Sequence, residues 1–190
     1  MARFLLDDGT GVILRPLRPS DREAFLGAFR KLSDRSCYLR FHKLDPRLRE
    51  RDIAYLTTVD QVDHVALAVF APSGGIALGR FVRLPEEPAT ADLTLTVVDG
   101  WQRRGIAKLL LAALMARARN VAITSFTASV LDENRPARTM MAAIAAPLRR
   151  EGSSWLYRLP TDPALLHPGP VADALARRDA ELARRFTPNG

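Results

Sequence analysis

A β-prone run, a glycine-centred turn and a long apolar helix follow one another between residues 91 and 119, and this succession constrains the fold most. In the run 91–98, apolar side chains alternate with Asp92 and two threonines, as in a strand with two different faces. The segment from about Gly105 to Arg119 is apolar almost all round, which predicts a helix buried against a sheet.

The rest of the chain alternates between strand and helix patterns in the same way. Alternating apolar residues predict strands, and short segments opened by capping residues predict helices. The order favours an α/β or α+β sheet with helices on both faces. The expected elements are a strand at 11–16; helices from Ser20, with Glu23 completing a capping box, from Ser33 and from Asp45; strands at 65–69, 76–84 and 91–98; the helix at 105–119; a strand at 121–131; a helix from Asp132 that ends before Pro147; and a hairpin at 148–159.

The 190 residues suit one domain and a short tail, which we place at 1–160 and 161–190. The tail begins with prolines and then has helical propensity from Val171 to Phe186. Its apolar residues lie close to one stripe, which docks either on the domain or on a second subunit. The sequence therefore leaves monomer and homodimer open.

Composition narrows the function classes. Cys37 is the single cysteine and the three histidines are scattered, so we expect neither a disulfide nor a metal site. The apolar runs are shorter than the roughly 18 residues of a membrane helix, and the N-terminus turns acidic early, so we expect a cytoplasmic protein. The net charge of +7 suits anionic partners, but aromatic residues do not interleave with the arginines, which makes nucleic-acid binding the weaker alternative.

The turn between strand and helix has the properties of an anion site. The first turn of a helix carries N–H groups without intrahelical partners, and the helix dipole adds positive potential. Gly105 allows close approach of the backbone, and Arg103 and Arg104 attract phosphate oxygens. The pattern is neither a Walker loop nor a dinucleotide fingerprint, since the required lysine and glycines are missing. Taken alone, it also fits a plain strand-to-helix turn with surface arginines.

The segment Gln102-Arg103-Arg104-Gly105-Ile106-Ala107 after Val97-Val98 resembles the acetyl-CoA signature of the GNAT N-acetyltransferase superfamily. The segments 32–41 and 78–84 resemble its bacterial protein-lysine acetyltransferase branch, and 130–134 resembles the family's fifth strand and its asparagine. The resemblance covers about 14–159. It implies a mixed, mostly antiparallel central sheet with helices on both faces.

The resemblance also implies roles for particular residues. Strands four and five of this family splay apart, and the pantetheine arm of acetyl-CoA enters the gap. The implied cofactor-binding residues are Val97 and Val98 for the arm, the backbone of Arg103, Arg104, Gly105, Ile106, Ala107 and Lys108 for the diphosphate, and Asn134 for the arm or a structural water. Asn134 also suits the N-cap of the next helix.

Direct transfer of an acetyl group needs a neutral amine, and a nearby base helps to form it. In the branch that this chain resembles, a glutamate in strand four has this role, and Asp92 is the matching residue. It also suits a solvent-facing aspartate near the strand end. Where many members have a tyrosine that protonates the departing thiolate, this chain has Met141.

The resemblance therefore implies an acetyltransferase that moves an acetyl group from acetyl-CoA to a primary amine, either a protein lysine or a small amine. Asp92 and Met141 motivate an alternative, an acetyl-CoA-binding sensor or interaction module without catalysis. No metal is expected in either case.

Overall fold

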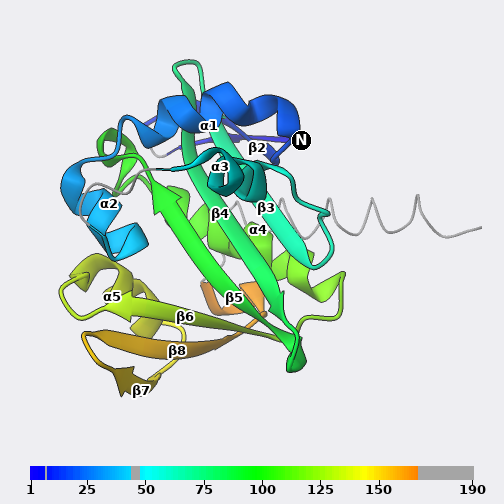
Figure 1. The fold of residues 1–190 in the computed structure, drawn as a ribbon, viewed down its shortest axis with the longest axis vertical. Helices are drawn as coiled ribbons and strands as arrows, with labels where there is room; N and C mark the ends of the chain where they lie inside the picture. Colours follow the sequence, from blue (N-terminus) through cyan, green and yellow to red (C-terminus); the bar gives the residue numbers. More distant parts are fainter. Residues whose placement is uncertain (7, 44–47, 167–190) are drawn as a thin grey trace, which may run out of the picture.

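A single sheet of eight strands runs through the computed structural model, which describes residues 1–6, 8–43 and 48–166 (Figure 1). The strand order is β1-β2-β3-β4-β5-β6-β8-β7. Every neighbouring pair is antiparallel except β5 and β6, which are parallel. The strands are β1 (Ala2–Leu5), β2 (Gly11–Pro16), β3 (His64–Ala71), β4 (Gly74–Leu84), β5 (Glu87–Val97), β6 (Ser125–Leu131), β7 (Pro147–Glu151) and β8 (Ser154–Pro160).

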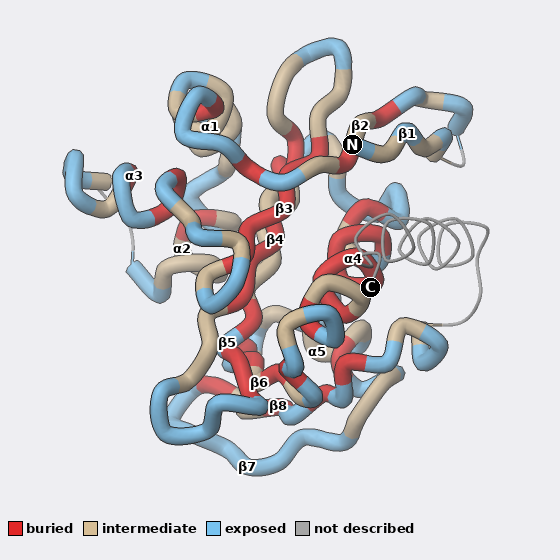
Figure 2. The backbone as a smooth tube through the Cα atoms, turned by 90° about the vertical axis from the view of Figure 1, so that its right-hand side faces the viewer, coloured by how far each residue is buried: buried red, intermediate tan, exposed pale blue. Residues whose placement is uncertain are grey.

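Helices cover both faces of the sheet, as Figure 2 shows. One face carries α1 (Arg22–Phe29), α2 (Asp34–Phe41) and α3 (Glu50–Thr57). The other carries α4 (Ile106–Arg119), which packs across β3, β4 and β5. Helix α5 (Arg135–Ala142) follows β6, and short 3-10 helices lie at Pro19–Asp21, Asp99–Trp101 and Pro163–Leu166. The expected mixed, mostly antiparallel sheet with helices on both faces is confirmed.

Helix α4 lies in close contact with the sheet because one strand residue facing it has no side chain. Nine of its fourteen residues are buried. A Cβ added at Gly79 of β4 would lie 2.8 Å from Leu114 Cδ1 and 2.9 Å from Leu95 Cδ2. Glycine at this position therefore sets the distance between the helix and the sheet.

Three details differ from the sequence-based expectations. Strand β1 was not expected; it forms a hairpin with β2 around Gly9, whose φ of 80° suits glycine. Helix α1 is not capped by Ser20, which lies within the 3-10 helix Pro19–Asp21; its N-cap is Asp21, whose carboxylate accepts the N–H of Arg18 at 2.8 Å. Helix α3 begins at Glu50 and not at Asp45, which lies outside the described residues.

Of the expected tail, only 161–166 are described, and the 3-10 helix there packs on α4. The helix expected at 171–186 lies outside the described residues, so the division at residue 160 stays a prediction. Within the described ranges, none of the helices combines the length and apolar character needed to cross a membrane.

Candidate functional site

Strands β5 and β6 pair over a short stretch and then separate. Their parallel register holds only from Thr90–Ser125 to Asp92–Thr127. Beyond it lies a cleft of about 350 Å³. Its walls come from β5, β6, the end of α2 and the length of α5, through Leu39, Arg40, Phe41, His42, Asp92, Leu93, Thr94, Leu95, Ala128, Ser129, Val130, Asn134, Ala137, Met140 and Met141.

The edge of β5 that borders the gap ends at Val97. The N–H of Val98 donates to Ile76 O at 2.9 Å, on the β4 side. Since backbone groups of successive strand residues point to opposite edges, the N–H and C=O of Val97 are directed towards the gap. Gln102 Nε2 donates to Val97 O at 3.1 Å and leaves the Val97 N–H to a ligand. Of the two valines expected to hold the pantetheine arm, the structure brings only Val97 to the gap.

The turn after β5 presents backbone N–H groups to solvent. Arg103 and Gly105 have positive φ angles of 60° and 78°. Intrahelical bonding in α4 begins with the N–H of Leu109, which donates to Gly105 O at 3.0 Å. The N–H groups of Gly105, Ile106, Ala107 and Lys108 therefore lack intrahelical acceptors. A Cβ built on Gly105 would meet no atom within 4 Å, so the space above the turn is open.

Side chains that sequence reasoning missed brace this turn. Asp99 accepts the N–H of Ser33 at 3.0 Å and the hydroxyls of Ser33 and Ser36 at 2.7 and 2.9 Å. Burial works to raise the pKa of Asp99, but these hydrogen bonds outweigh it and the net shift is downward. The side chain of Arg104, expected to attract phosphate oxygens, pairs with Asp8 at 2.9 Å on the surface.

Asp92 lies at the other end of the gap, on the face that carries α1–α3. The Asp92 side chain is exposed to solvent within the cleft, and the walls of the cleft partly desolvate its carboxyl. Burial raises the pKa of Asp92, and the charges of Arg40 and Arg80 partly oppose that rise. A carboxylate with a raised pKa is a better proton acceptor than an aspartate with the ordinary pKa.

Asn134 and Met141 line the cleft from α5. Asn134 caps this helix, since its Oδ1 accepts the N–H of Ala137 at 3.3 Å. Met141 is buried and has no proton to donate. The structure therefore places Asn134 at the cleft and gives it the capping role as well.

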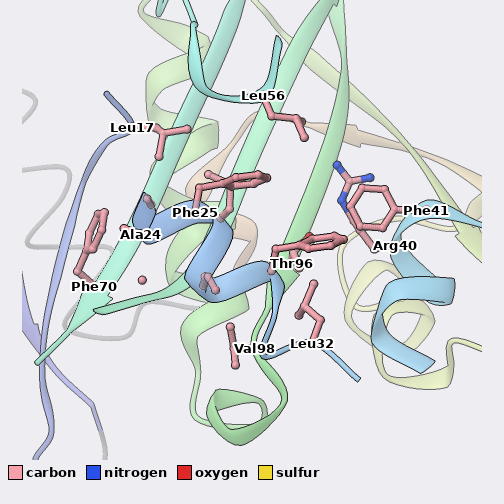
Figure 3. Close-up of a pocket in the computed structure, with 16 residues that line it drawn as sticks. Leu17, Ala24, Phe25, Leu32, Arg40, Phe41, Leu56, Phe70, Thr96 and Val98 are labelled. Carbon is pink, nitrogen blue, oxygen red and sulfur yellow. The ribbon is translucent and has the colours of Figure 1, made fainter. Parts of the chain in front are cut away.

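An apolar pocket adjoins the cleft on the side of α1 (Figure 3). Its space is about 60 Å³, and Phe25, Leu32 and Phe41 belong to its lining. Val98 faces this pocket and not the cleft. Arg40 and Phe41 line both spaces and form the wall between them.

Over the parts of the chain that the structure describes, no group of three or more histidine, cysteine, aspartate or glutamate residues could hold a metal ion. Cys37 is buried in α2.

Comparisons with known proteins agree with this geometry. The family model "Acetyltransferase (GNAT) domain" matches residues 12–145. Acetyltransferase Pat of Mycolicibacterium smegmatis is 34% identical over 145 residues, which are 75% of this chain and 43% of that protein. The chain thus spans less than half the length of this curated relative.

Two solved structures share the fold. The GNAT domain of S. lividans PAT superposes with a TM-score of 0.78 at 32% identity, over 84% of this chain and 96% of that one. The cAMP-binding acyltransferase from Mycobacterium smegmatis gives 0.64 at 26% identity, over 98% of this chain and 56% of that one. Since the family model covers most of the chain and both Pat proteins match it, the chain belongs to the GNAT acetyltransferase family.

Proposed function

We propose that this chain transfers the acetyl group of acetyl-CoA to a primary amine, of a protein lysine or a small molecule, by direct attack within the β5–β6 gap. One observation carries the proposal: the gap has an open helix N-terminus at one end and a carboxylate of raised pKa at the other. Asp92 and Val97 are five residues apart on β5, roughly 17 Å along a strand.

The residues present fit acetyl-CoA. The unpaired N–H groups from Gly105 to Lys108 suit a diphosphate, and the first turn of α4 has no acidic residue that would repel it. The N–H of Val97 suits a carbonyl of the pantetheine arm. Acetyl-CoA would supply a thioester carbonyl and a thiolate leaving group.

Asp92 would take a proton from the attacking amine. An ammonium cannot attack a carbonyl, and a carboxylate on the α1–α3 face removes the proton where the acceptor enters. Aspartate is one methylene shorter than glutamate, so a water molecule would bridge the distance.

The described lining of the cleft offers no tyrosine to protonate the departing thiolate, and Met141 stands where the family often has one. The thiolate of coenzyme A is a tolerable leaving group near its own pKa, so the reaction does not require this acid.

The first test is release of free thiol from acetyl-CoA across a panel of amines and lysine peptides. Gly105→Glu is the control, because a carboxylate above the turn repels the diphosphate. We expect thiol release from the natural chain and none from the variant. Acetyl-CoA binding without thiol release, across the whole panel, would favour the alternative of a sensor or interaction module.

The second test is Asp92→Ala. If Asp92 is the base, turnover falls by about 10²–10⁴-fold while acetyl-CoA affinity changes little. Unchanged turnover at neutral pH would remove Asp92 from the mechanism and leave the cofactor site intact.

A further inference from the structure

Two arginines stand beside Asp92 on the α1–α3 face. Arg40, from α2, lines the cleft next to it. Arg80, from β4, pairs in register with Thr94, which also lines the cleft. The two guanidinium groups are close enough to act electrostatically on each other and on Asp92. Burial and the charge of Arg80 lower the pKa of Arg40 to about 10, although Asp92 opposes this, and Arg40 stays charged at neutral pH.

Arg80 is buried, with 9% of its surface exposed, yet its hydrogen bonding is incomplete. Nη2 donates to the hydroxyl of Tyr55 at 3.1 Å, and the guanidinium carbon lies 4.8 Å from the centre of the Tyr55 ring. Nη1 is buried and has no acceptor among the described residues. Since a buried, charged N–H without an acceptor is costly, this group suits an acceptor supplied from outside the chain.

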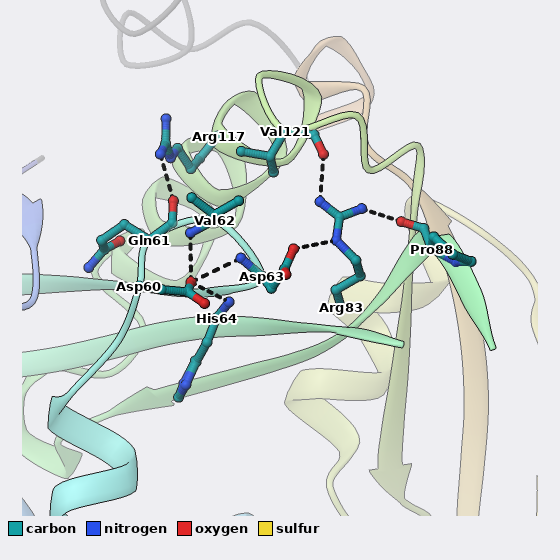
Figure 4. Close-up of polar contacts among 9 residues, drawn as sticks. All are labelled: Asp60, Gln61, Val62, Asp63, His64, Arg83, Pro88, Arg117 and Val121. Atoms are coloured by element: carbon teal, nitrogen blue, oxygen red, sulfur yellow. Dashed lines mark hydrogen bonds and ion pairs between the residues drawn. The ribbon is translucent and has the colours of Figure 1, made fainter. Parts of the chain in front are cut away.

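A second unpaired nitrogen lies next to this arginine. The ring of His64 packs on Tyr55, with centroids 5.0 Å apart, and its buried Nε2 has no partner among the described residues. Asp60 fixes this strand end, because its Oδ1 accepts the N–H groups of Val62, Asp63 and His64 (Figure 4). The unpaired nitrogens therefore sit on a braced scaffold.

The charges around Asp92 do not balance. Burial, and then the charge of Arg80, lower the pKa of His64, so this ring is neutral at neutral pH. Two guanidinium groups then face one carboxylate. An amine with no other charge would arrive as a cation at a site that already has a net positive charge, whereas an amine that brings a carboxylate would complement it.

We propose that Arg40 and Arg80 form a carboxylate subsite beside Asp92, and that the acceptor is a small zwitterion with its amine and carboxylate a few atoms apart. The acceptor carboxylate takes the unpaired N–H of Arg80 and pairs with Arg40, while its amine lies at Asp92. This inference rests on the proposed function and narrows its acceptor from any primary amine to one class.

The test compares ω-amino acids with ω-amino alcohols of the same chain length, glycine with ethanolamine and so on, at saturating acetyl-CoA. Each pair keeps the amine and exchanges the carboxylate for a neutral hydroxyl. We expect kcat/KM for thiol release to be roughly tenfold to a hundredfold higher for the best amino acid than for its alcohol. Arg40→Gln and Arg80→Met should remove this preference, and Arg80→Lys, which keeps the charge, should retain part of it.

The matched control is Arg35→Gln. Arg35 is exposed on the same helix as Arg40, and its substitution changes the net charge equally. The preference should survive in this variant. Equal kcat/KM values for amino acids and amino alcohols in the natural chain would overturn the proposal. It would also be overturned if the Arg40 and Arg80 variants changed the affinity for acetyl-CoA but kept the preference for amino acids.

A binding measurement separates this inference from the proposed function. If no amine releases thiol, the proposed function fails. The carboxylate subsite is then tested by the thermal unfolding midpoint of the natural chain, measured with each amino acid and with its matched amino alcohol. A rise with the amino acid alone, lost in Arg40→Gln, supports the subsite, and equal midpoints overturn it.

Discussion

Ser33 and Asp99 lie 66 residues apart in the sequence, and their side chains meet at 2.7 Å. Ser33 is the N-cap of α2, and Asp99 begins the turn that leads to α4. This contact ties the helix that carries Arg40 to the turn proposed to hold the diphosphate. Acceptor wall and cofactor turn are thereby fixed to each other.

Asp99→Ala should weaken both stability and cofactor binding. Loss of the hydrogen bonds from Ser33 and Ser36 should lower the free energy of unfolding by about 1–2 kcal/mol, because the site is largely exposed to water. Urea unfolding measures this, and the KM for acetyl-CoA should rise. Asp99→Asn keeps one acceptor oxygen, so its free energy of unfolding should lie between those of Asp99→Ala and the natural chain. A midpoint equal to that of the natural chain would show that the contact contributes nothing.

Asp21→Asn should lower the free energy of unfolding by about 2–3 kcal/mol at neutral pH, because it weakens a largely buried ion pair. Arg15 binds Asp21 through two contacts of 2.6 and 2.7 Å, and its hydrogen bonds lower the pKa of Asp21. A lowered folded-state pKa stabilises above the unfolded pKa of about 3.9, and the gain is lost as pH falls through the folded value.

The difference in unfolding free energy between this variant and the natural chain should therefore shrink below about pH 4. Glu50→Gln, which breaks the exposed pair with Arg22, is the control and should cost less than about 0.5 kcal/mol. A difference that stays constant into acid would contradict the assignment.

Gly105→Ala should cost about 1 kcal/mol of stability, since the residue has a φ of 78° that an L side chain rarely adopts. The added methyl meets no protein atom, but it occupies the space above the turn where the diphosphate is proposed to lie, so calorimetry should show weaker acetyl-CoA binding. Gly100→Ala lies in the same turn, also meets no atom within 4 Å and has no positive φ, so it should be neutral. Equal stability of both variants would argue against backbone strain at Gly105.

Gly79→Ala should destabilise the fold by about 1–3 kcal/mol, because its methyl would press on Leu95 and Leu114 in a filled core. Gly27→Ala is the contrasting variant: its methyl meets open space within α1, where alanine should add about 0.5–1 kcal/mol. Thermal unfolding of the two variants checks this, because the midpoint should fall in Gly79→Ala and rise in Gly27→Ala. A neutral Gly79→Ala would mean that α4 moves away from the sheet without cost.

The acid limb of the pH–rate profile should follow Asp92. Because burial raises its pKa, activity should fall at a higher pH than the ordinary aspartate value would give. Arg40→Gln removes a cation that opposes this rise, so the limb should move to still higher pH. The profile is measured with an amino alcohol as acceptor, because this acceptor has no carboxylate to occupy the proposed subsite. The control Arg35→Gln should leave the acid limb at the same pH. If the acid limb of Arg40→Gln lies at the same pH as that of the natural chain, Arg40 does not influence the pKa of Asp92.

Local pattern was enough to predict the central part of the fold. Alternation in 91–98 and the apolar segment after it correctly indicated β5 and a buried α4, because both signals depend on neighbours in sequence. Strand β1 was missed, although Asp8-Gly9 is a recognised signal for a hairpin turn.

The surroundings of Asp92 could not be predicted in the same way. Arg40 and Arg80 come from a helix and a strand 40 residues apart, and only the register between β4 and β5 places Arg80 next to Thr94. Asp99 presented the same difficulty, since its partners lie in α2. Val98 was assigned to the gap because strand direction alone does not say which edge each N–H faces.

The separation of β5 from β6 also divides the sheet into two halves. Three residue pairs join them in register, fewer than at any other junction of neighbouring strands in the described sheet. The contact of Phe81 with Phe126, 5.3 Å between centroids, spans the same junction. A molecule bound along the edge of β5 would act as a missing strand between two half-sheets. Its concentration would then set the stability of the folded chain as well as the rate of reaction.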